Sequence, residues 1–157
     1  MLSTKSRLFL VAALVAVTMY TTYRQPNMLH IGMLSVLAIL AIDKATWLPF
    51  LGQAAMPVSL FQPSIPSGAN QSIEVPAPPG ARRVVYWASS HANARHPSDA
   101  YAGYRNAGVS DVVDGVAVMN IRSPHEYSIR GKRIPKHIHY RFIYAHGLLS
   151  DVKTTMI

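Results

Sequence analysis

The 157-residue chain contains no cysteine. Disulfide scaffolds, thiolate zinc sites, iron–sulfur clusters and catalysis by a cysteine nucleophile are therefore excluded. Acidic residues are also scarce: 7 Asp and Glu stand against 15 Lys and Arg, which gives a formal net charge of +8. A surface this basic can meet anionic lipid headgroups, nucleic acid or acidic protein. No nucleic-acid recognition motif accompanies the charge, so nucleic acid is not an expected partner.

Both long apolar runs of the chain fall short of the roughly 20 residues that a transmembrane helix needs. They cover residues 8–23 and 28–42, and a polar turn with a proline, residues 24–27, separates them. Flanking side chains that reach the headgroups, or local thinning of the bilayer, can make up the missing length. We therefore expect residues 1–51 to form a hairpin of two hydrophobic transmembrane helices, which would make this an integral membrane protein with the lipid bilayer as a partner.

Two other interpretations of this apolar start stay open. A basic residue before an apolar stretch is also typical of a cleaved signal peptide, although the bulky residues from Thr18 to Tyr23 lack a small-residue cleavage site. A buried helical hairpin of a soluble protein is the other interpretation, but the rest of the chain is small for covering it. The sequence therefore favours the membrane anchor and leaves the side of the membrane open.

Proline is concentrated between residues 57 and 79, where six prolines alternate with Ser, Gly, Asn and Gln. Such a composition is typical of an extended segment with few packing residues. We predict that residues 52–81 form a Pro-rich linker, which separates the hairpin from a folded domain over residues 82–157. The chain has no internal repeat.

No convincing amphipathic helix follows the linker, and short β-branched and aromatic segments take its place. Asp114-Gly115 has the residues that a two-residue hairpin turn prefers. The expected strands are residues 82–89, 116–121, 137–145 and 153–157. The sequence therefore predicts a mainly β domain, built as a small antiparallel β-sandwich or barrel.

The segment from His137 to Ala145 alternates as an extended strand does, because successive side chains of a strand point to opposite faces. One face carries His137, His139, Arg141 and Ile143, and the apolar and aromatic residues between them form the other. Two histidines two apart on a strand can present their ring nitrogens to one metal ion. A pair of surface or hydrogen-bonded histidines is the alternative, because a metal site needs further ligands.

Five segments of this domain resemble the core motifs of the intradiol ring-cleavage dioxygenases. Residues 114–127 (DGVAVMNIRSPHEY) are similar to the family's DG turn and its strand ending in iRPxxY, and residues 135–140 (PKHIHY) to its PxHIHF motif. Residues 85–88 (VYWA), 101–106 (YAGYRN) and 149–156 (LSDVKTTM) are similar to an earlier strand, to the GxYxxxN segment and to the closing strand. The resemblance implies the family's fold, a β-sandwich of short antiparallel strands.

The resemblance also implies a non-haem Fe(III) site. Its ligands would be Tyr127, His137 and His139, with Tyr104 as the better and Tyr101 as the weaker candidate for a second tyrosine. Phenolate and neutral imidazole ligands suit Fe(III). The implied activity is the cleavage of a catechol-type aromatic ring, in which a displaced tyrosinate serves as the base.

The resemblance further implies a catalytic cation, which stabilises the negative charge that develops beside the iron. Arg133 is the candidate. The family commonly has its arginine directly before the proline of PxHIH, whereas Ile134 stands between Arg133 and Pro135 here. In an extended segment, this shift by one residue turns the arginine to the opposite face. The domain is also shorter than typical members and lacks the longer loops that build their substrate pocket.

The tyrosines also have an ordinary interpretation, because aromatic residues are common in β-sheets and the chain has 8 tyrosines. A second function therefore stands beside the enzyme: a non-enzymatic structural protein whose domain binds structural partners or further copies of itself. A small basic domain joined to a membrane hairpin would suit a minor capsid or inner-membrane component of a large virus particle. The sequence leaves open whether the protein is an enzyme.

Overall fold

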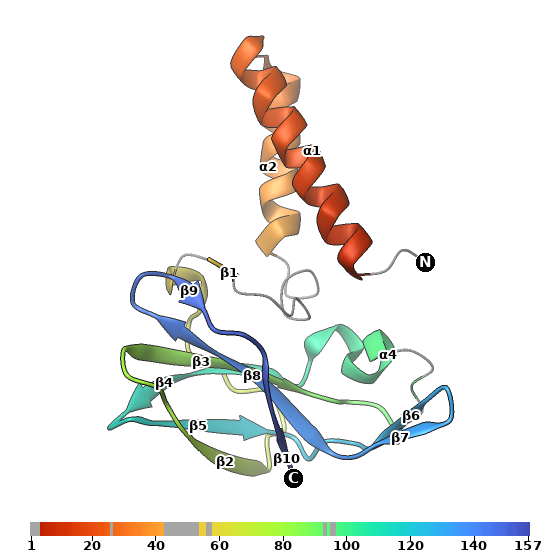
Figure 1. Cartoon of the computed structure of the whole chain (residues 1–157), viewed down its shortest axis with the longest axis vertical. Helices are drawn as coiled ribbons and strands as arrows, with labels where there is room; N and C mark the ends of the chain where they lie inside the picture. Colours follow the sequence, from red (N-terminus) through yellow and green to blue (C-terminus); the bar gives the residue numbers. More distant parts are fainter. Residues whose placement is uncertain (1–3, 26, 43–53, 56–57, 93, 95–96) are drawn as a thin grey trace. The chain divides into compact units, whose positions relative to one another are not determined.

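The computed structural model describes residues 4–25, 27–42, 54–55, 58–92, 94 and 97–157. The chain divides into two compact units, Met1–Phe50 and Leu51–Ile157. The predicted boundary between residues 51 and 52 lies outside the described residues. The first unit contains the helices α1 (Thr4–Arg24) and α2 (Met28–Ile42), and the second unit contains the strands (Figure 1).

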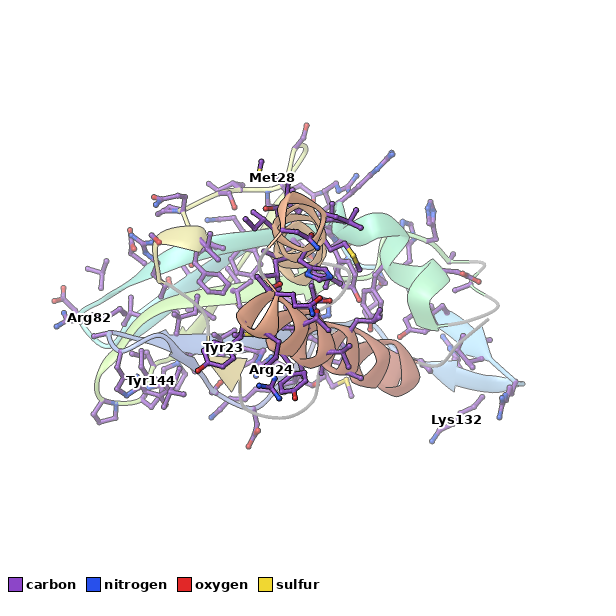
Figure 2. The ribbon with its side chains drawn as sticks, turned by 90° about the horizontal axis from the view of Figure 1, so that it is seen from above. Tyr23, Arg24, Met28, Arg82, Lys132 and Tyr144 are labelled. Carbon is purple, nitrogen blue, oxygen red and sulfur yellow. The ribbon has the colours of Figure 1, made fainter. Side chains whose placement is uncertain are left out.

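The two helices of the first unit occupy the two apolar runs of the sequence. Figure 2 shows Tyr23 and Arg24 where α1 ends and Met28 where α2 begins. Between them, the side chain of Asn27 accepts a hydrogen bond from the backbone N–H of His30 at 2.9 Å, which caps the start of α2. The helices contact each other, so the polar turn joins a pair of helices.

The prediction of two transmembrane helices is wrong. Among the described residues, neither helix combines the length and the apolar character that crossing a bilayer requires. α2 is apolar but has 15 residues, which reach about 22 Å against a hydrocarbon core of about 30 Å. α1 has 21 residues, but its sequence includes Lys5, Arg7 and Arg24 and three threonines in its second half.

The second unit is built mainly from antiparallel strands. Its large sheet comprises β1 (Ala54–Ala55), β2 (Gln71–Pro76), β3 (Ala81–Ala88), β4 (Ala107–Val113), β5 (Val116–Ile121), β8 (His137–Tyr144), β9 (Leu148–Leu149) and β10 (Lys153–Met156). A separate hairpin consists of β6 (Tyr127–Ile129) and β7 (Lys132–Ile134). The helical segments are η1 (Val58–Leu60), α4 (Pro97–Tyr101) and η2 (Ala102–Tyr104).

The large sheet corrects the expected architecture, because its described strands form one curled sheet and not a sandwich of two separate sheets (Figure 1). The strand order is β1-β9-β8-β3-β4-β5-β2. β10 lies outside this order and pairs with residues 137–140 of β8. β4 connects the two halves of this sheet. It pairs with β3 along residues 107–111 and with β5 at residues 112–113, so one strand serves both halves of the sheet.

The main core lies on the inner face of the curled sheet. Every second residue of β3, β5 and β8 points into it, as the alternation of side chains along a strand requires. Its buried members are Val75, Val84, Tyr86, Ala88, Ala117, Met119, Ile121, Ile138 and Phe142. The predicted strands over residues 82–89, 116–121, 137–145 and 153–157 are therefore confirmed as β3, β5, β8 and β10.

The turn between β4 and β5 is the hairpin turn that the sequence predicts. Val113 pairs with Val116, so the loop consists of Asp114 and Gly115 alone. Both residues have positive φ, 50° and 76°. Asp and Gly adopt this left-handed conformation at the lowest cost, and its twist matches the twist of the strands.

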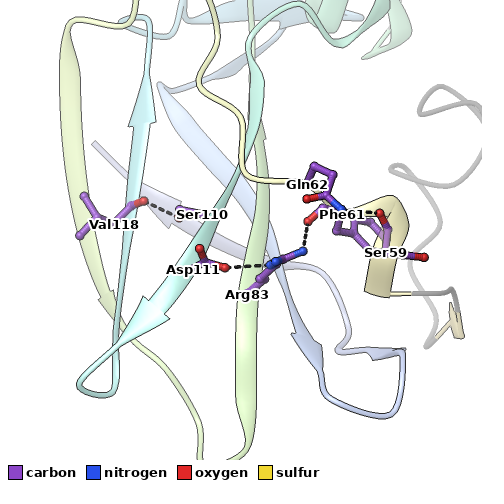
Figure 3. Close-up of polar contacts among 7 residues, drawn as sticks. All are labelled: Ser59, Phe61, Gln62, Arg83, Ser110, Asp111 and Val118. Atoms are coloured by element: carbon purple, nitrogen blue, oxygen red, sulfur yellow. Dashed lines mark hydrogen bonds and ion pairs between the residues drawn. The ribbon is translucent and has the colours of Figure 1, made fainter.

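Part of the range predicted as a linker, residues 52–81, belongs to the sheet. β2 lies within it and pairs with β5, and Phe61 before β2 is only 2% exposed. Arg83 of β3 holds this stretch: its Nη1 donates to the backbone oxygen of Phe61 at 2.5 Å and its Nε to Asp111 at 2.8 Å (Figure 3). Prolines do not prevent the pairing, because β2 is an edge strand and its only proline, Pro76, is its last residue.

Candidate functional site

β8 carries the two histidines of the candidate site. It pairs with β3 on one side and with β10 on the other, so Trp87 and Thr154 lie opposite His139 in the neighbouring strands. Ile138 points into the main core. His137 and His139 therefore lie on the opposite face, which confirms the alternation predicted for this strand.

α4 brings Tyr101 to these histidines. The backbone oxygen of Ala100 accepts hydrogen bonds from the N–H groups of Ser90 at 2.6 Å and His91 at 3.2 Å, so the short helix is tied to the chain just beyond β3. Gly103 and Tyr104 after it have φ values of 68° and 59°. These left-handed residues interrupt the helical path between Tyr101 and Tyr104.

Tyr127 reaches the site from the start of β6. The hydroxyl of Ser89 donates to the backbone oxygen of His125 at 2.5 Å. Asn106 is buried, and its amide nitrogen donates to the backbone oxygens of Ser89 at 3.2 Å and Arg122 at 3.0 Å. Its side-chain oxygen accepts from the N–H of Arg122 at 2.9 Å. These bonds hold the segment before Tyr127 against the end of β3.

Four polar side chains from three elements meet here, and we call them the four-donor cluster: Tyr101, Tyr127, His137 and His139. The hydroxyl oxygen of Tyr101 lies 3.2 Å from the hydroxyl of Tyr127, 3.3 Å from Nε2 of His137 and 2.9 Å from Nε2 of His139. The two Nε2 atoms are 3.1 Å apart. Both tyrosines and His137 are buried, and His139 is half-buried.

The outer nitrogens of both histidines are also engaged. Nδ1 of His137 lies 2.7 Å from the backbone oxygen of Pro135. A carbonyl oxygen only accepts, so this nitrogen carries the proton and Nε2 of His137 presents a lone pair to the cluster. Nδ1 of His139 lies 2.8 Å from the hydroxyl of Thr154. The ring of Trp87 packs near that of His139, with the centroids 5.5 Å apart.

Burial shifts the protonation equilibria of the cluster. Desolvation, and then the neighbouring Tyr127, raise the pKa of Tyr101 well above its usual range. Burial, and then the nearby His137, lower the pKa of His139 to about 4. Without a cation, the cluster therefore holds a phenol at Tyr101 and a neutral imidazole at His139 at neutral pH. A bound cation would favour the phenolate.

The spacing and chemistry of the cluster fit a metal ion. Ligands about 2.0–2.1 Å from an ion lie about 2.9 Å apart at neighbouring octahedral positions and about 3.3 Å apart in a tetrahedron. The hydroxyl of Tyr101 lies 2.9–3.3 Å from the other three donors and the two Nε2 atoms are 3.1 Å apart, and these four separations fall in this range. Phenol and imidazole donors without a thiolate suit Fe(III). The described residues contain no group of three or more His, Cys, Asp and Glu for a metal ion, and two donors of this cluster are tyrosines.

The structure brings together three of the four residues predicted as metal ligands: Tyr127, His137 and His139. The fourth donor is the hydroxyl of Tyr101. The resemblance gives Tyr101 as a weaker candidate than Tyr104 for the second tyrosine ligand. The ring of Tyr104 lies parallel to that of Tyr101, with an interplanar angle of 2° and centroids 5.8 Å apart. Tyr104 therefore lies next to the cluster and packs against the ring of Tyr101.

Arg133, the predicted catalytic cation, lies at the surface. Its guanidinium donates to Glu126 at 2.7 Å, and its side chain is 76% exposed. The pairing of β6 with β7 explains this position: Tyr127 lies opposite Ile134, and Arg133 is one residue away, on the other face of the hairpin. Figure 2 shows the neighbouring Lys132 at the end of the unit that is remote from Arg82.

The sequence holds a signal that favours Tyr101. Pro97 is typical of a first helical turn and Gly103 of a helix end, so a short helix would contain Tyr101 and leave Tyr104 beyond it. The sequence does not indicate that the hydroxyl of Thr154 is a hydrogen-bond partner of His139. Its position depends on the register between β8 and β10, which no local pattern fixes.

Comparisons of the chain with family models, with curated proteins and with solved structures found no match. The resemblance to the intradiol dioxygenases therefore stays a prediction from the sequence motifs.

Proposed function

We propose that the protein is intradiol dioxygenase-like, binding Fe(III) through Tyr101, Tyr127, His137 and His139 and cleaving a catechol-type aromatic ring. One observation carries the proposal: side chains from α4, β6 and β8 converge at the hydroxyl of Tyr101, which lies 2.9–3.3 Å from the other three donors. α4 lies well before β6 and β8 in the sequence, and hydrogen bonds tie α4 and the segment before β6 to the chain at the end of β3. The family motifs support the same ligands, with Tyr101 in place of Tyr104.

When bound, Fe(III) supplies Lewis-acid activation of a catecholate towards dioxygen. The residues of the chain prepare the site for this chemistry. His139 offers a neutral imidazole nitrogen, since its pKa is lowered to about 4, and the bond from Nδ1 of His137 to Pro135 leaves Nε2 of that ring facing the cluster. Burial of the tyrosines limits the access of water.

Tyr101 is the residue that moves a proton in this proposal. Burial raises the pKa of its hydroxyl, so a Tyr101 phenolate released from a bound cation would be a strong base. It would accept a proton from a catechol hydroxyl and become a phenol. Tyr127 would be the tyrosine that keeps holding the cation.

Oxygen uptake by the iron-loaded full chain tests this function. With catechol as the substrate, we expect dioxygen consumption and a ring-opened dicarboxylic acid. The variant Tyr101→Phe should lower the rate by about 100-fold or more, the usual loss when a general base is removed. Tyr104→Phe is the matched control and should keep most of the rate. Iron-loaded protein that yields no ring-opened product would contradict the enzymatic proposal.

A non-enzymatic role is the second candidate, and the position of Arg133 favours it. Because this side chain is 76% exposed and bonded to Glu126, it does not supply a cation to the cluster. In this role a bound ion would link α4, β6 and β8, and the domain would bind structural partners or further copies of itself. Coloured, iron-loaded protein without ring cleavage would favour this role.

A further inference from the structure

The two histidines of the four-donor cluster have different outer partners. Nδ1 of His137 faces the backbone oxygen of Pro135 at 2.7 Å, whereas Nδ1 of His139 faces the hydroxyl of Thr154 at 2.8 Å. A carbonyl only accepts a hydrogen bond, but a hydroxyl can either donate or accept one. The ring of His137 is therefore held in one tautomer, and that of His139 is free to adopt two.

The distance between the rings selects the tautomer of His139 in the metal-free protein. In the neutral ring of His137, the proton is on Nδ1, so Nε2 has none. Nε2 of His139 lies 3.1 Å from it and 2.9 Å from the hydroxyl of Tyr101. Two bare nitrogens at this distance would repel each other, so Nε2 of His139 carries a proton. Its Nδ1 is then bare, and the hydroxyl of Thr154 donates to it.

A metal ion in the cluster requires the opposite arrangement. Nε2 of His139 must present its lone pair, so the ring proton leaves Nε2 and a proton is bound at Nδ1, with no change in the charge of the ring. Nδ1 then donates to the hydroxyl oxygen of Thr154, which becomes the acceptor. Thr154 is exposed on β10, so solvent can supply the proton that Nδ1 binds, while the proton of Nε2 leaves as the ion enters the cluster.

We propose that Thr154 is a positioning residue for the metal site: its hydroxyl reverses its hydrogen bond to His139 and so satisfies both tautomers. This inference rests on the proposed metal binding and gives a role to Thr154, for which the resemblance implies none. The neighbouring Trp87 packs against the same ring from β3, so His139 is fixed between two strands while its proton moves.

Nitrogen NMR of the full chain tests the inference without any activity. The metal-free protein should carry the proton of His139 on Nε2, and addition of Ga(III), a diamagnetic substitute for Fe(III), should move it to Nδ1. A proton on Nδ1 of His139 in the metal-free protein would contradict the proposed reversal of the hydrogen bond between Thr154 and His139. That result leaves the proposed function intact, whereas failure of the wild type to bind either ion contradicts the proposed function and the inference together.

Substitutions on β10 supply the second test. Thr154→Val keeps the shape but leaves Nδ1–H of His139 without an acceptor, and we expect Fe(III) affinity to fall about 10–100-fold, as for other outer partners of ligating histidines. Thr154→Ser keeps the hydroxyl and should restore the affinity. Thr155→Val is the matched control, because this residue is next in the strand and points to the other face. Equal affinity of Thr154→Val and wild type would overturn the role of Thr154.

Discussion

Tyr101 and Tyr104 are three residues apart, and their rings stack in parallel with centroids 5.8 Å apart. The hydroxyl of Tyr101 contacts three other donors of the cluster, at 2.9–3.3 Å. Tyr101→Phe should therefore reduce Fe(III) affinity by more than the roughly 10–100-fold expected for an outer partner. Tyr104→Phe should leave it nearly unchanged. Iron titration of both variants checks this, and a larger loss in Tyr104→Phe would reverse the assignment.

His139 makes the stability of the metal-free protein depend on pH. Its pKa is about 4 in the folded protein and about 6.5 in an unfolded chain. Between these values the unfolded chain binds more protons, so the free energy of unfolding falls as the pH drops from about 6.5 to about 4. The loss should be at most about 3 kcal/mol.

Urea unfolding at a series of pH values in this interval measures the effect of His139. The variant His139→Gln is the control, because glutamine does not titrate and should show a weaker pH dependence. The same pH dependence in variant and wild type would mean that His139 is not the responsible group.

At the scale of elements, β4 requires glycine at residue 108. A Cβ there would overlap the hydroxyl of Tyr86 and lie 2.6 Å from the backbone oxygen of Ser64. That backbone is fixed, since Ser64 and Val109 exchange two hydrogen bonds of 2.9 Å. Gly108→Ala should therefore lower the free energy of unfolding by about 1–3 kcal/mol, the usual result of overpacking.

Thermal unfolding of the full chain checks the role of Gly108. Gly32→Ala is the control variant, because among the described residues no atom beyond the neighbouring helix backbone lies within 4 Å of a Cβ at that position, and alanine favours helix α2. Unchanged stability of Gly108→Ala would show that the segment around Ser64 does not pack against β4 as described.

Elements with a strong local pattern could be predicted from the sequence. β8 alternates over eight residues, and β5 follows a turn whose residues suit positive φ. β2 could not be recognised, because the surrounding prolines dominate its composition although Ile73 and Val75 alternate with polar neighbours. β6 and β7 have three residues each, which is too short for a period to be visible.

The residues of the candidate site are harder to predict from the sequence than the strands, because their positions depend on pairing between distant segments. The spacing of His137 and His139 on one strand puts them on one face whatever the rest of the chain does. The choice of Tyr101 depends on where a five-residue helix ends, and the position of Arg133 on the register of a hairpin. Thr154 depends on which strand pairs with the edge of β8. Such pairings are set by the packing of the whole unit.

At the scale of the whole molecule, the division into two units predicts which truncations fold. A chain that begins at Leu51 keeps every described strand and should fold with the stability of the second unit. A chain that begins at Ala81 lacks β2 and the buried side chains of Phe61 and Val75. Their loss should cost more than about 4 kcal/mol.

Circular dichroism melting curves of the two truncated chains test this division. The expected result is a cooperative transition for the longer chain and a lower or absent transition for the shorter one. Equal melting temperatures would mean that residues 51–80 are a linker after all.

Titration of the full chain with Fe(III), followed by visible absorbance, measures directly whether the four-donor cluster binds a metal ion. The four-donor cluster predicts one bound ion per chain and a visible band from tyrosinate-to-iron charge transfer, which Tyr127→Phe and His137→Ala should remove or weaken. A colourless protein that retains no iron after dialysis would contradict the proposed metal site.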